Sequence, residues 1–202
     1  MANKNLSIRR MTELALLIAI ELVMKLIGLG TVPIGPLNMS FLTIPIAVGA
    51  ILMGPGGGAI MGGAYGLMSF YDAITGPGGM TAVFFQLDPI NTFILCVGAR
   101  VLVGLCAGLL FKGLHKVDQK KTVSYFIASL SAPLLNTFFF MGYIVLVFYQ
   151  TEYIQNLVTS LGAANPLHFI VALVGVQGLV EAVACSIVGG IVSKNVAKAL
   201  KR

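Results

Sequence analysis

Six polar side chains stand inside long apolar stretches of this 202-residue chain, where each is costly to bury in a membrane. They are Glu21, Arg100, Asn136, Tyr143, Gln177 and Glu181. A cation, amides, a phenol and carboxylates that converge in an apolar bundle can surround a small polar molecule. A proton pump is expected to carry a chain of acids instead, and a channel a ring of like groups. The mixture therefore favours a binding pocket.

Arg100 is the most informative of these residues. It lies in the apolar stretch Asp88–Lys116, which is long enough to cross a bilayer. A helix rises about 1.5 Å per residue, so Arg100 is about 18 Å from the start of this stretch, near the middle of a hydrocarbon core about 30 Å thick. A charge at that depth indicates a functional site. One alternative stays open, in which Glu21 or Glu181 neutralises Arg100 and no ligand is involved.

Motifs for catalysis and for metal binding are absent from the sequence. There is no HExxH motif, no nucleophile–base pattern and no pair of carboxylates at catalytic spacing, and the 2 histidines are far apart. Three cysteines, Cys96, Cys106 and Cys185, lie in apolar runs without CxxC spacing, and we interpret them as small buried hydrophobes. We therefore expect neither an enzyme nor a metal or cofactor site.

The composition is typical of a multi-pass membrane protein. Hydrophobic residues make up 57% of the chain and charged residues 10%, whereas a soluble domain has about 25% charged residues. We expect one membrane domain over residues 1–202, without a separate soluble domain. The net charge of +6 does not indicate nucleic-acid binding, because the basic residues do not interleave with aromatic ones.

Six apolar runs are expected to form transmembrane helices, which predicts an all-α membrane protein. Their expected bounds are Met11–Leu29, Asn38–Gly54, Ala59–Phe70, Asp88–Lys116, Thr122–Tyr149 and Leu167–Val192. Gly54–Gly58, with the sequence GPGGG, is interpreted as a tight reversal between the second and third runs. The first, third and fifth connections, Gly28–Leu37, Tyr71–Pro89 and Gln150–Pro166, are predicted to be loops.

Small and charged residues at helical spacing predict contacts between these helices. Gly58, Gly62 and Gly66 recur every four residues, and Gly104 and Gly108 do the same in the fourth run, so each set is predicted to be a packing face. In the first run Glu21 and Lys25 are also four residues apart and can pair.

The basic residues predict the orientation in the membrane. All of the 13 Lys and Arg residues except Lys25 and Arg100 lie in the N-terminal leader, around the connector His115–Lys121 or in the C-terminal tail. With six spans these three segments share one side of the membrane, and the positive-inside rule makes that side cytoplasmic. Both termini are therefore expected in the cytoplasm.

Two motifs carry a resemblance to a known family. One is the segment NMSFLTIPIAVGAILMGPGGGAIMGGAYG, in which a polar-led helix, a GP reversal and a glycine-rich helix follow one another; the other is the step from Ala15 to Ala19 in the first run. In both features, in size and in span number, nearly the whole chain resembles the substrate-binding S component of bacterial energy-coupling factor (ECF) vitamin transporters. The resemblance implies a plasma-membrane protein that binds its vitamin in the outward half, under the first, third and fifth loops.

The same resemblance implies protein partners. The AxxxA step of the family docks on the transmembrane coupling (T) subunit, and in this chain that step is Ala15 and Ala19. The alternative for the two alanines is packing within the bundle. No ATPase motif occurs in the sequence, so two ATPase subunits of an ECF module are expected to supply the energy.

Within the family the chain is most similar to the pantothenate-type branch. The similar segments are VPIGPLNMSFLTIPIAVGAILMGP, GARVLVGLCAGLLFK and the pair Asn136-Thr137. This implies that Arg100 meets the carboxylate of pantothenate, while Asn136 and Gln177 bind its amide and hydroxyls; Tyr143 and Glu181 complete the predicted site. The absence of Trp argues against riboflavin and thiamine. Open alternatives are another vitamin, such as folate, a pyridoxine-like ligand or riboflavin, and a solitary secondary transporter or channel.

Overall fold

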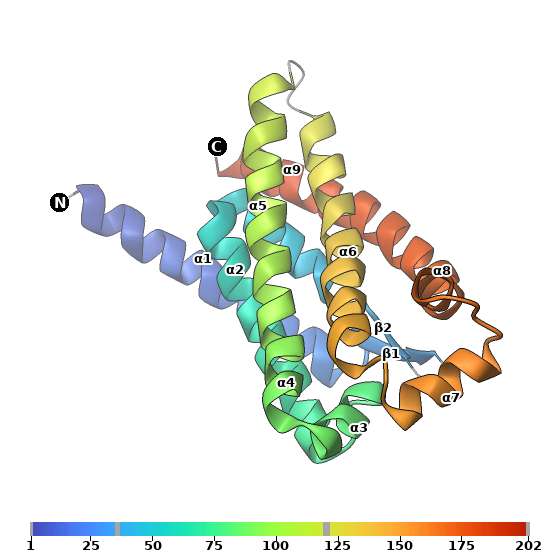
Figure 1. The fold of residues 1–202 in the computed structure, drawn as a ribbon. Helices are drawn as coiled ribbons and strands as arrows, with labels where there is room; N and C mark the ends of the chain where they lie inside the picture. The colour runs from blue at the N-terminus through green and yellow to red at the C-terminus, as the bar shows by residue number, and fades with distance from the viewer. Residues whose placement is uncertain (1, 35–36, 119–121, 201–202) are drawn as a thin grey trace.

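The computed structural model describes residues 2–34, 37–118 and 122–200. Within these ranges the chain is helical apart from turns and one short β-hairpin (Figure 1). Four helical stretches of the described chain are long and apolar enough to cross a membrane, namely Thr43–Thr75, Pro89–Val117, Val123–Phe148 and Pro166–Ala199.

The first helix, α1, runs over Ala2–Leu26 and leaves the rest of the bundle at an oblique angle (Figure 1). It therefore includes the basic leader, which the sequence-based prediction left outside the first span, and it ends three residues before the predicted Leu29. Its apolar run is diluted by charged side chains at both ends, among them Arg9, Arg10 and Lys25. For this reason α1 falls outside the four stretches selected by length and hydropathy.

A hairpin follows α1 where a loop was predicted. Its strands β1 (Thr31–Ile34) and β2 (Leu37–Ser40) pair antiparallel, with Thr31 opposite Ser40 and Ile34 opposite Leu37. The β-branched residues of β1 favour a strand, and a two-stranded ribbon has free edges that tolerate Pro33. Residues 35–36 of the predicted loop lie outside the described residues. The fold is helical as predicted apart from this hairpin, where the prediction of a loop is wrong, and the second run becomes helical at Thr43 instead of Asn38.

Helix α2 (Thr43–Thr75) consists of two arms that meet at Gly54. Gly54 has φ 78° and ψ −170°, a conformation that glycine adopts without a Cβ clash, and Pro55 follows it. Met61 packs against Gly49, although these residues would be about 18 Å apart in a straight helix. The predicted reversal is confirmed. The second arm, however, continues five residues beyond the predicted end at Phe70.

The next membrane stretch is built from α4 (Pro89–Phe93), the π-helical turn η1 (Ile94–Gly98) and α5 (Ala99–Val117). Together they match the predicted fourth run, Asp88–Lys116, to within one residue at each end. Asp88 caps the first turn by accepting a hydrogen bond from the Asn91 N–H at 3.0 Å, which explains why the helix begins there.

The second arm of α2 lies antiparallel to this stretch, with backbone against backbone. A Cβ added to Gly58, Gly62 or Gly66 would meet the main chain of Gly104, Arg100 or Cys96, in that order. Gly108 similarly lies against the backbone of Pro55. The predicted glycine packing faces are therefore confirmed, and they fix the position of Arg100 relative to α2.

The C-terminal part of the chain adds two more long stretches. The first comprises α6 (Val123–Tyr143) and the π-helical turn η2 (Ile144–Phe148). The second comprises α8 (Pro166–Ala184), the π-helical turn η3 (Cys185–Gly189) and α9 (Gly190–Ala199). The predicted fifth run is confirmed to within one residue at each end, whereas the sixth continues seven residues into the basic tail. Residues 119–121 of the predicted connector and residues 201–202 lie outside the described chain.

Two predicted loops contain helices that close one end of the bundle. Helix α3 (Met80–Leu87) lies within Tyr71–Pro89, and α7 (Glu152–Ser160) lies within Gln150–Pro166. Their apolar side chains enter a buried cluster in which the rings of Phe84 and Phe148 stack at a centroid distance of 4.2 Å. These segments are too short to cross a membrane, and burial of their apolar faces stabilises them as helices.

Candidate functional site

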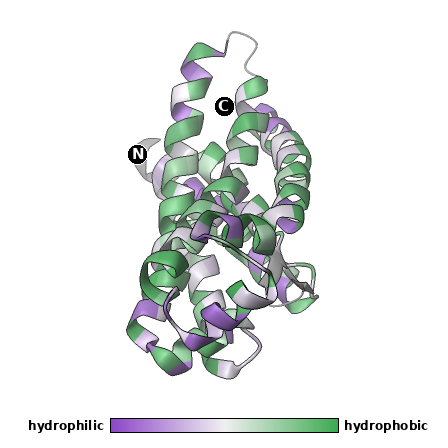
Figure 2. Ribbon diagram, turned by 45° about the vertical axis from the view of Figure 1, so that its right-hand side comes forward, coloured by the Kyte–Doolittle hydropathy of each residue, from purple (hydrophilic) through white to green (hydrophobic). Residues whose placement is uncertain are grey.

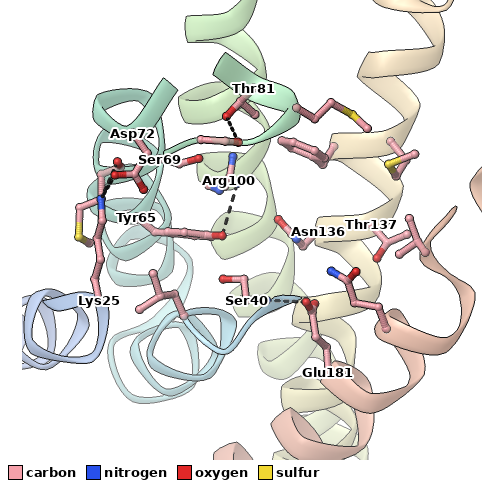
Figure 3. Close-up of a pocket in the computed structure, with 18 residues that line it drawn as sticks. Lys25, Ser40, Tyr65, Ser69, Asp72, Thr81, Arg100, Asn136, Thr137 and Glu181 are labelled. Carbon is pink, nitrogen blue, oxygen red and sulfur yellow. Dashed lines mark hydrogen bonds and ion pairs between the residues drawn. The ribbon is translucent and has the colours of Figure 1, made fainter. Parts of the chain in front are cut away.

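A cavity lies between the second arm of α2 and helices α5, α6 and α8, with the end of α1 and of β2 at its edge (Figure 3). Its polar lining residues are Lys25, Ser40, Tyr65, Ser69, Asp72, Thr81, Arg100, Asn136, Thr137, Gln177 and Glu181. The cavity has a volume of about 80 Å³. One water needs about 10–15 Å³ of such volume, so the cavity has room for several waters or part of a small organic molecule.

Arg100 points into this cavity and is only 5% exposed. Its Nη1 donates to the Cys96 carbonyl oxygen at 3.0 Å, and its Nη2 lies 3.4 Å from the Tyr65 hydroxyl. The guanidinium carbon is 4.3 Å from the centroid of the Tyr65 ring and 5.0 Å from that of Phe140. Arg100 is therefore held by two aromatic rings and by the main chain of its own helix.

Arg100 retains unused hydrogen-bonding capacity. A guanidinium has five N–H donors, and the buried Nε of Arg100 has no acceptor among the described residues. Within the described chain, moreover, no carboxylate lies within ion-pair distance of Arg100. The alternative in which Glu21 or Glu181 forms an ion pair with Arg100 is therefore not what the structure shows.

Glu21 and Lys25 do not form the pair that their spacing allowed. The Lys25 Nζ lies 2.8 Å from Asp72 Oδ1 and also donates to the Met68 carbonyl oxygen at 2.8 Å. Glu21 is fully buried, and neither of its carboxylate oxygens has a hydrogen-bond partner in the described residues. The long Lys25 side chain, at the last turn of α1, reaches the second arm of α2, whereas Glu21 faces the interior one turn earlier.

Glu181 connects α8 to the β-hairpin. The Ser40 N–H donates to Glu181 Oε1 at 2.6 Å, so the end of β2 is attached to the wall of the cavity (Figure 3). Gln177 lies one turn before Glu181 and also lines the cavity. From α6, Asn136 contributes an Oδ1 atom that is buried without a partner in the described chain. The structure thus brings together four of the five predicted binding residues.

Tyr143 is the predicted binding residue that the structure places elsewhere. It is seven residues beyond Asn136, about 10 Å further along α6, and does not line the cavity. Its hydroxyl donates to Asn91 Oδ1 at 2.6 Å, and the Asn91 side chain in turn donates to Asp88 Oδ2 at 2.7 Å. Tyr143 therefore contacts the capped start of α4. Residue type suggested a shared site, but depth in the bundle separates Tyr143 from it.

Several lining residues were missed in the sequence. The third run was expected to end at Phe70, just after Ser69. Asp72 lies beyond that point and was therefore assigned to a loop, although both residues line the cavity from α2. Tyr65 and Phe140 are aromatic residues in apolar runs, and residue type alone does not distinguish a wall of a polar site from ordinary core. Phe140 follows Asn136 by four residues, and that helical spacing was the signal available for finding it.

The charged side chains that line the cavity are not all paired with one another. Its described lining has two cations, Lys25 and Arg100, and two carboxylates, Asp72 and Glu181. Lys25 is paired with Asp72, and Glu181 is bound by the Ser40 N–H. Arg100 is thus the cation of the described lining that has no carboxylate partner. The arrangement suits an anionic ligand that also has groups for the amides of Asn136 and Gln177.

Ala15 and Ala19 lie on the exposed surface of α1, away from the cavity. They share this surface with large apolar side chains such as Leu16, which is 63% exposed. The two alanines therefore do not pack within the described bundle, which was the alternative to an interface with another protein.

Fold and cavity together define a helical membrane protein with an internal pocket lined by polar side chains. Residues 9–193 match the family described as "ECF transporter, substrate-specific component", and the chain belongs to this family. It has a role in membrane transport rather than catalysis, with a vitamin as substrate and an ECF module as partner. The chain is also 28% identical over 163 residues to the pantothenate transporter PanT of Leuconostoc mesenteroides, an alignment that covers 76% of this chain and 74% of that relative.

Proposed function

We propose that this protein binds pantothenate with high affinity and imports it together with an ECF module. The observation that carries the proposal is Arg100, a buried cation without a carboxylate partner in the described chain, at the wall of a cavity lined by amides. The 28% identity to a pantothenate transporter supports the same ligand.

The roles of the lining residues follow from the chemistry of pantothenate, which is an anion with hydroxyls and an amide. Arg100 binds the carboxylate through donors that the protein leaves free, and such charge-assisted bonds are roughly twice as strong as neutral ones. Tyr65 and Phe140 keep the guanidinium in place through their ring faces. The unpartnered Oδ1 of Asn136 accepts a hydrogen bond from a ligand hydroxyl or amide N–H, and Gln177 binds a second polar group.

The ligand is tested with purified full-length protein and two matched compounds, pantothenate and its neutral alcohol analogue. We expect calorimetry to show strong binding of pantothenate and weak binding of the alcohol, because the alcohol lacks the charge that Arg100 recognises. Equal binding of the two compounds would refute the proposed role of Arg100. Mass spectrometry of small molecules released from the purified protein separates pantothenate from folate, pyridoxine-like ligands and riboflavin.

The proposed topology has six spans in the bacterial plasma membrane, formed by one domain with both termini in the cytoplasm. The spans are α1, the two arms of α2 and the three long stretches that follow. The reversal at Gly54 supports the count of two arms. The orientation is supported by the starting end of α1 and the final end of α9, which lie toward the same end of the molecule as the basic end of α5 (Figure 1). Cysteine labelling at positions 4 and 201 from outside intact cells would contradict this topology if either site reacted.

The proposed module partners are a T subunit, which docks on Ala15 and Ala19, and two ATPase subunits. Exposure of both alanines on an apolar helix surface supports this docking site, since close helix approach needs small side chains. Replacing both with Trp is expected to abolish complex formation and transport while pantothenate binding persists. If pantothenate binding is lost to the same extent as complex formation, the alanines are needed for the fold of this subunit and do not act only at the interface. Uptake by the reconstituted protein without any ATPase would favour a solitary transporter.

A further inference from the structure

A second cavity lies at the other end of α5. It is an open groove with a volume of about 310 Å³, compared with about 80 Å³ for the first cavity. Its lining residues are Ile51, Gly54, Pro55, Gly108, Phe111, Lys112, His115 and Lys116. Lys112 is 12 residues beyond Arg100, which places this groove about 18 Å further along the helix. The groove is therefore separate from the proposed vitamin site.

The floor and walls of the groove are apolar and fixed. Gly108 lies against the backbone of Pro55, which leaves no side chain between α5 and the reversal of α2. Phe111 stacks on His115 with a centroid distance of 4.9 Å. His115 Nδ1 in turn shares a hydrogen bond of 2.9 Å with the Ser124 hydroxyl. This wall is thus tied to the start of α6.

The rim of the groove is basic. Lys112 and Lys116 are exposed, and neither takes part in an ion pair within the described residues. Asp118 is the one acid in the sequence between Asp88 and Glu152. Its Oδ2 accepts a hydrogen bond from the Ser124 N–H at 2.8 Å. The two lysines therefore offer positive charge to a partner outside the chain.

Along one face of α5, apolar side chains precede these basic ones. Leu105, Leu109, Lys112 and Lys116 follow one another at steps of four, three and four residues, which places them on the same helix face. Leu105 is 36% exposed and Leu109 53% exposed. Hydrophilic residues mark this end of α5, after a largely apolar middle (Figure 2). The order from apolar to basic is that of a lipid, with its acyl chain in the membrane and its headgroup at the surface.

We propose that the groove binds an anionic phospholipid. The phosphate lies between Lys112 and Lys116, one acyl chain fills the apolar groove, and the other follows the exposed Leu109 and Leu105 beside it. The basic end of a membrane span lies at the level of the headgroups, where clustered lysines attract anionic lipids. Free phosphate would use the lysines but gain nothing from the apolar lining, whereas each buried methylene of an acyl chain is favourable. The proposal does not depend on which vitamin the other cavity binds.

The test is a lipid titration of the full-length protein in neutral detergent, followed by native mass spectrometry. Dioleoyl phosphatidylglycerol is the probe, and dioleoyl phosphatidylcholine is the neutral control lipid. Attraction of an anionic surface is worth about fivefold in affinity per lysine, so Lys112→Gln/Lys116→Gln is expected to weaken phosphatidylglycerol binding on the order of 25-fold. Lys194→Gln/Lys198→Gln removes the same net charge from exposed positions four apart on α9, outside the groove, and is expected to change it less than twofold.

Two further arms make the test decisive. Glycerol phosphate carries the headgroup without acyl chains, and it is expected not to compete; competition at equal concentration would show a free-anion site and overturn the proposal. Equal loss of phosphatidylglycerol in the two double variants would reduce the effect to overall charge and would also overturn it. So would a Lys112→Gln/Lys116→Gln protein that retains the lipid but no longer assembles with the ECF module, because the groove would then bind a protein.

Discussion

The two cations of the cavity, Arg100 and Lys25, have opposite surroundings. Lys25 comes from the last turn of α1 and is 2.8 Å from the carboxylate of Asp72. Arg100 comes from the middle of a membrane stretch, and aromatic rings and a main-chain carbonyl surround it in place of a carboxylate. Lys25 therefore has a carboxylate partner within the chain, whereas Arg100 has none among the described residues.

The difference shows why a buried charge by itself does not locate a binding site. An ion pair such as Lys25–Asp72 connects α1 to the second arm of α2, and a ligand would have to displace one partner to use the other. Ring faces attract a guanidinium without consuming its N–H donors, so Arg100 is held in position while its Nε, which has no acceptor in the described chain, stays available. The surroundings of a charge, more than its depth, indicate its function.

The largest expected effect is that of Arg100→Ala on pantothenate binding. The change removes a charge-assisted contact and leaves the ligand carboxylate in a cavity without a free cation, so affinity is expected to fall about 100-fold or more, or roughly 3 kcal/mol. Arg100→Lys keeps the charge but loses the planar fork, and a fall of about tenfold is expected. Calorimetry with the purified variants measures both.

The neutral alcohol analogue supplies the control for this prediction. It binds the parent protein weakly, and Arg100→Ala is expected to reduce its affinity little further. If the alanine variant weakens acid and alcohol equally, or unfolds at room temperature, Arg100 has a structural role and the case for an anionic vitamin loses its main support.

The next effect on pantothenate affinity is expected from Phe140 on α6, whose ring contacts the guanidinium of Arg100. Phe140→Leu removes a cation–π contact worth about 0.5–2 kcal/mol, and pantothenate affinity is expected to fall between about 2-fold and 30-fold. Phe138→Leu is the matched control, since Phe138 is 69% exposed on the same helix. The same loss in both variants would show that the ring at Phe140 has no specific effect on Arg100.

Much of this arrangement could be predicted from the sequence. The glycine spacing of α2 and α5, the reversal at Gly54 and the bounds of the fourth and fifth runs depend on local patterns, and the structure confirms them. Arg100, Asn136, Gln177 and Glu181 were expected to converge because polar groups in a membrane avoid lipid, and they do line one cavity.

The rest depends on contacts between distant segments, which no local pattern contains. Glu21 and Lys25 have the spacing of a helical pair, but Asp72, 47 residues after Lys25, takes the lysine instead. The hairpin before α2 and the helices α3 and α7 are stabilised by packing and by contacts such as Ser40 with Glu181. Tyr143 was grouped with the site by residue type, because the sequence did not show its contact with Asn91.

A smaller effect is expected when Lys25 loses its carboxylate partner Asp72, and this change tests the difference between Lys25 and Arg100 directly. Asp72→Asn removes the carboxylate that Lys25 contacts and leaves a second free cation at the cavity edge. In the Arg100→Ala background this change is expected to restore pantothenate affinity severalfold, because Lys25 then offers a charge to the ligand carboxylate. Asp88→Asn in the same background is the control, since Asp88 does not line the cavity. Recovery in both double variants, or in neither, would show that the Lys25–Asp72 pair does not decide which cation meets the ligand.

The smallest effect is expected at Asp88, a carboxylate outside the cavity. Asp88 should change the stability of the fold with pH but should not change ligand binding. Hydrogen bonds from the Asn91 N–H and side chain lower the pKa of Asp88 below its ordinary value. A lowered pKa in the folded protein means that ionised Asp88 adds stability above its ordinary pKa, and that this contribution disappears as the pH falls through the lowered value. Thermal unfolding of the parent is therefore expected at a slightly higher temperature than that of Asp88→Asn near neutral pH, with the two melting temperatures converging in strong acid.

Pantothenate affinity is expected to be the same in the parent and in Asp88→Asn. A difference in melting temperature that persists in acid would show that Asp88 stabilises the helix start through packing and not through its charge. A change in pantothenate affinity would show that the Asp88–Asn91–Tyr143 contact contributes to ligand binding after all.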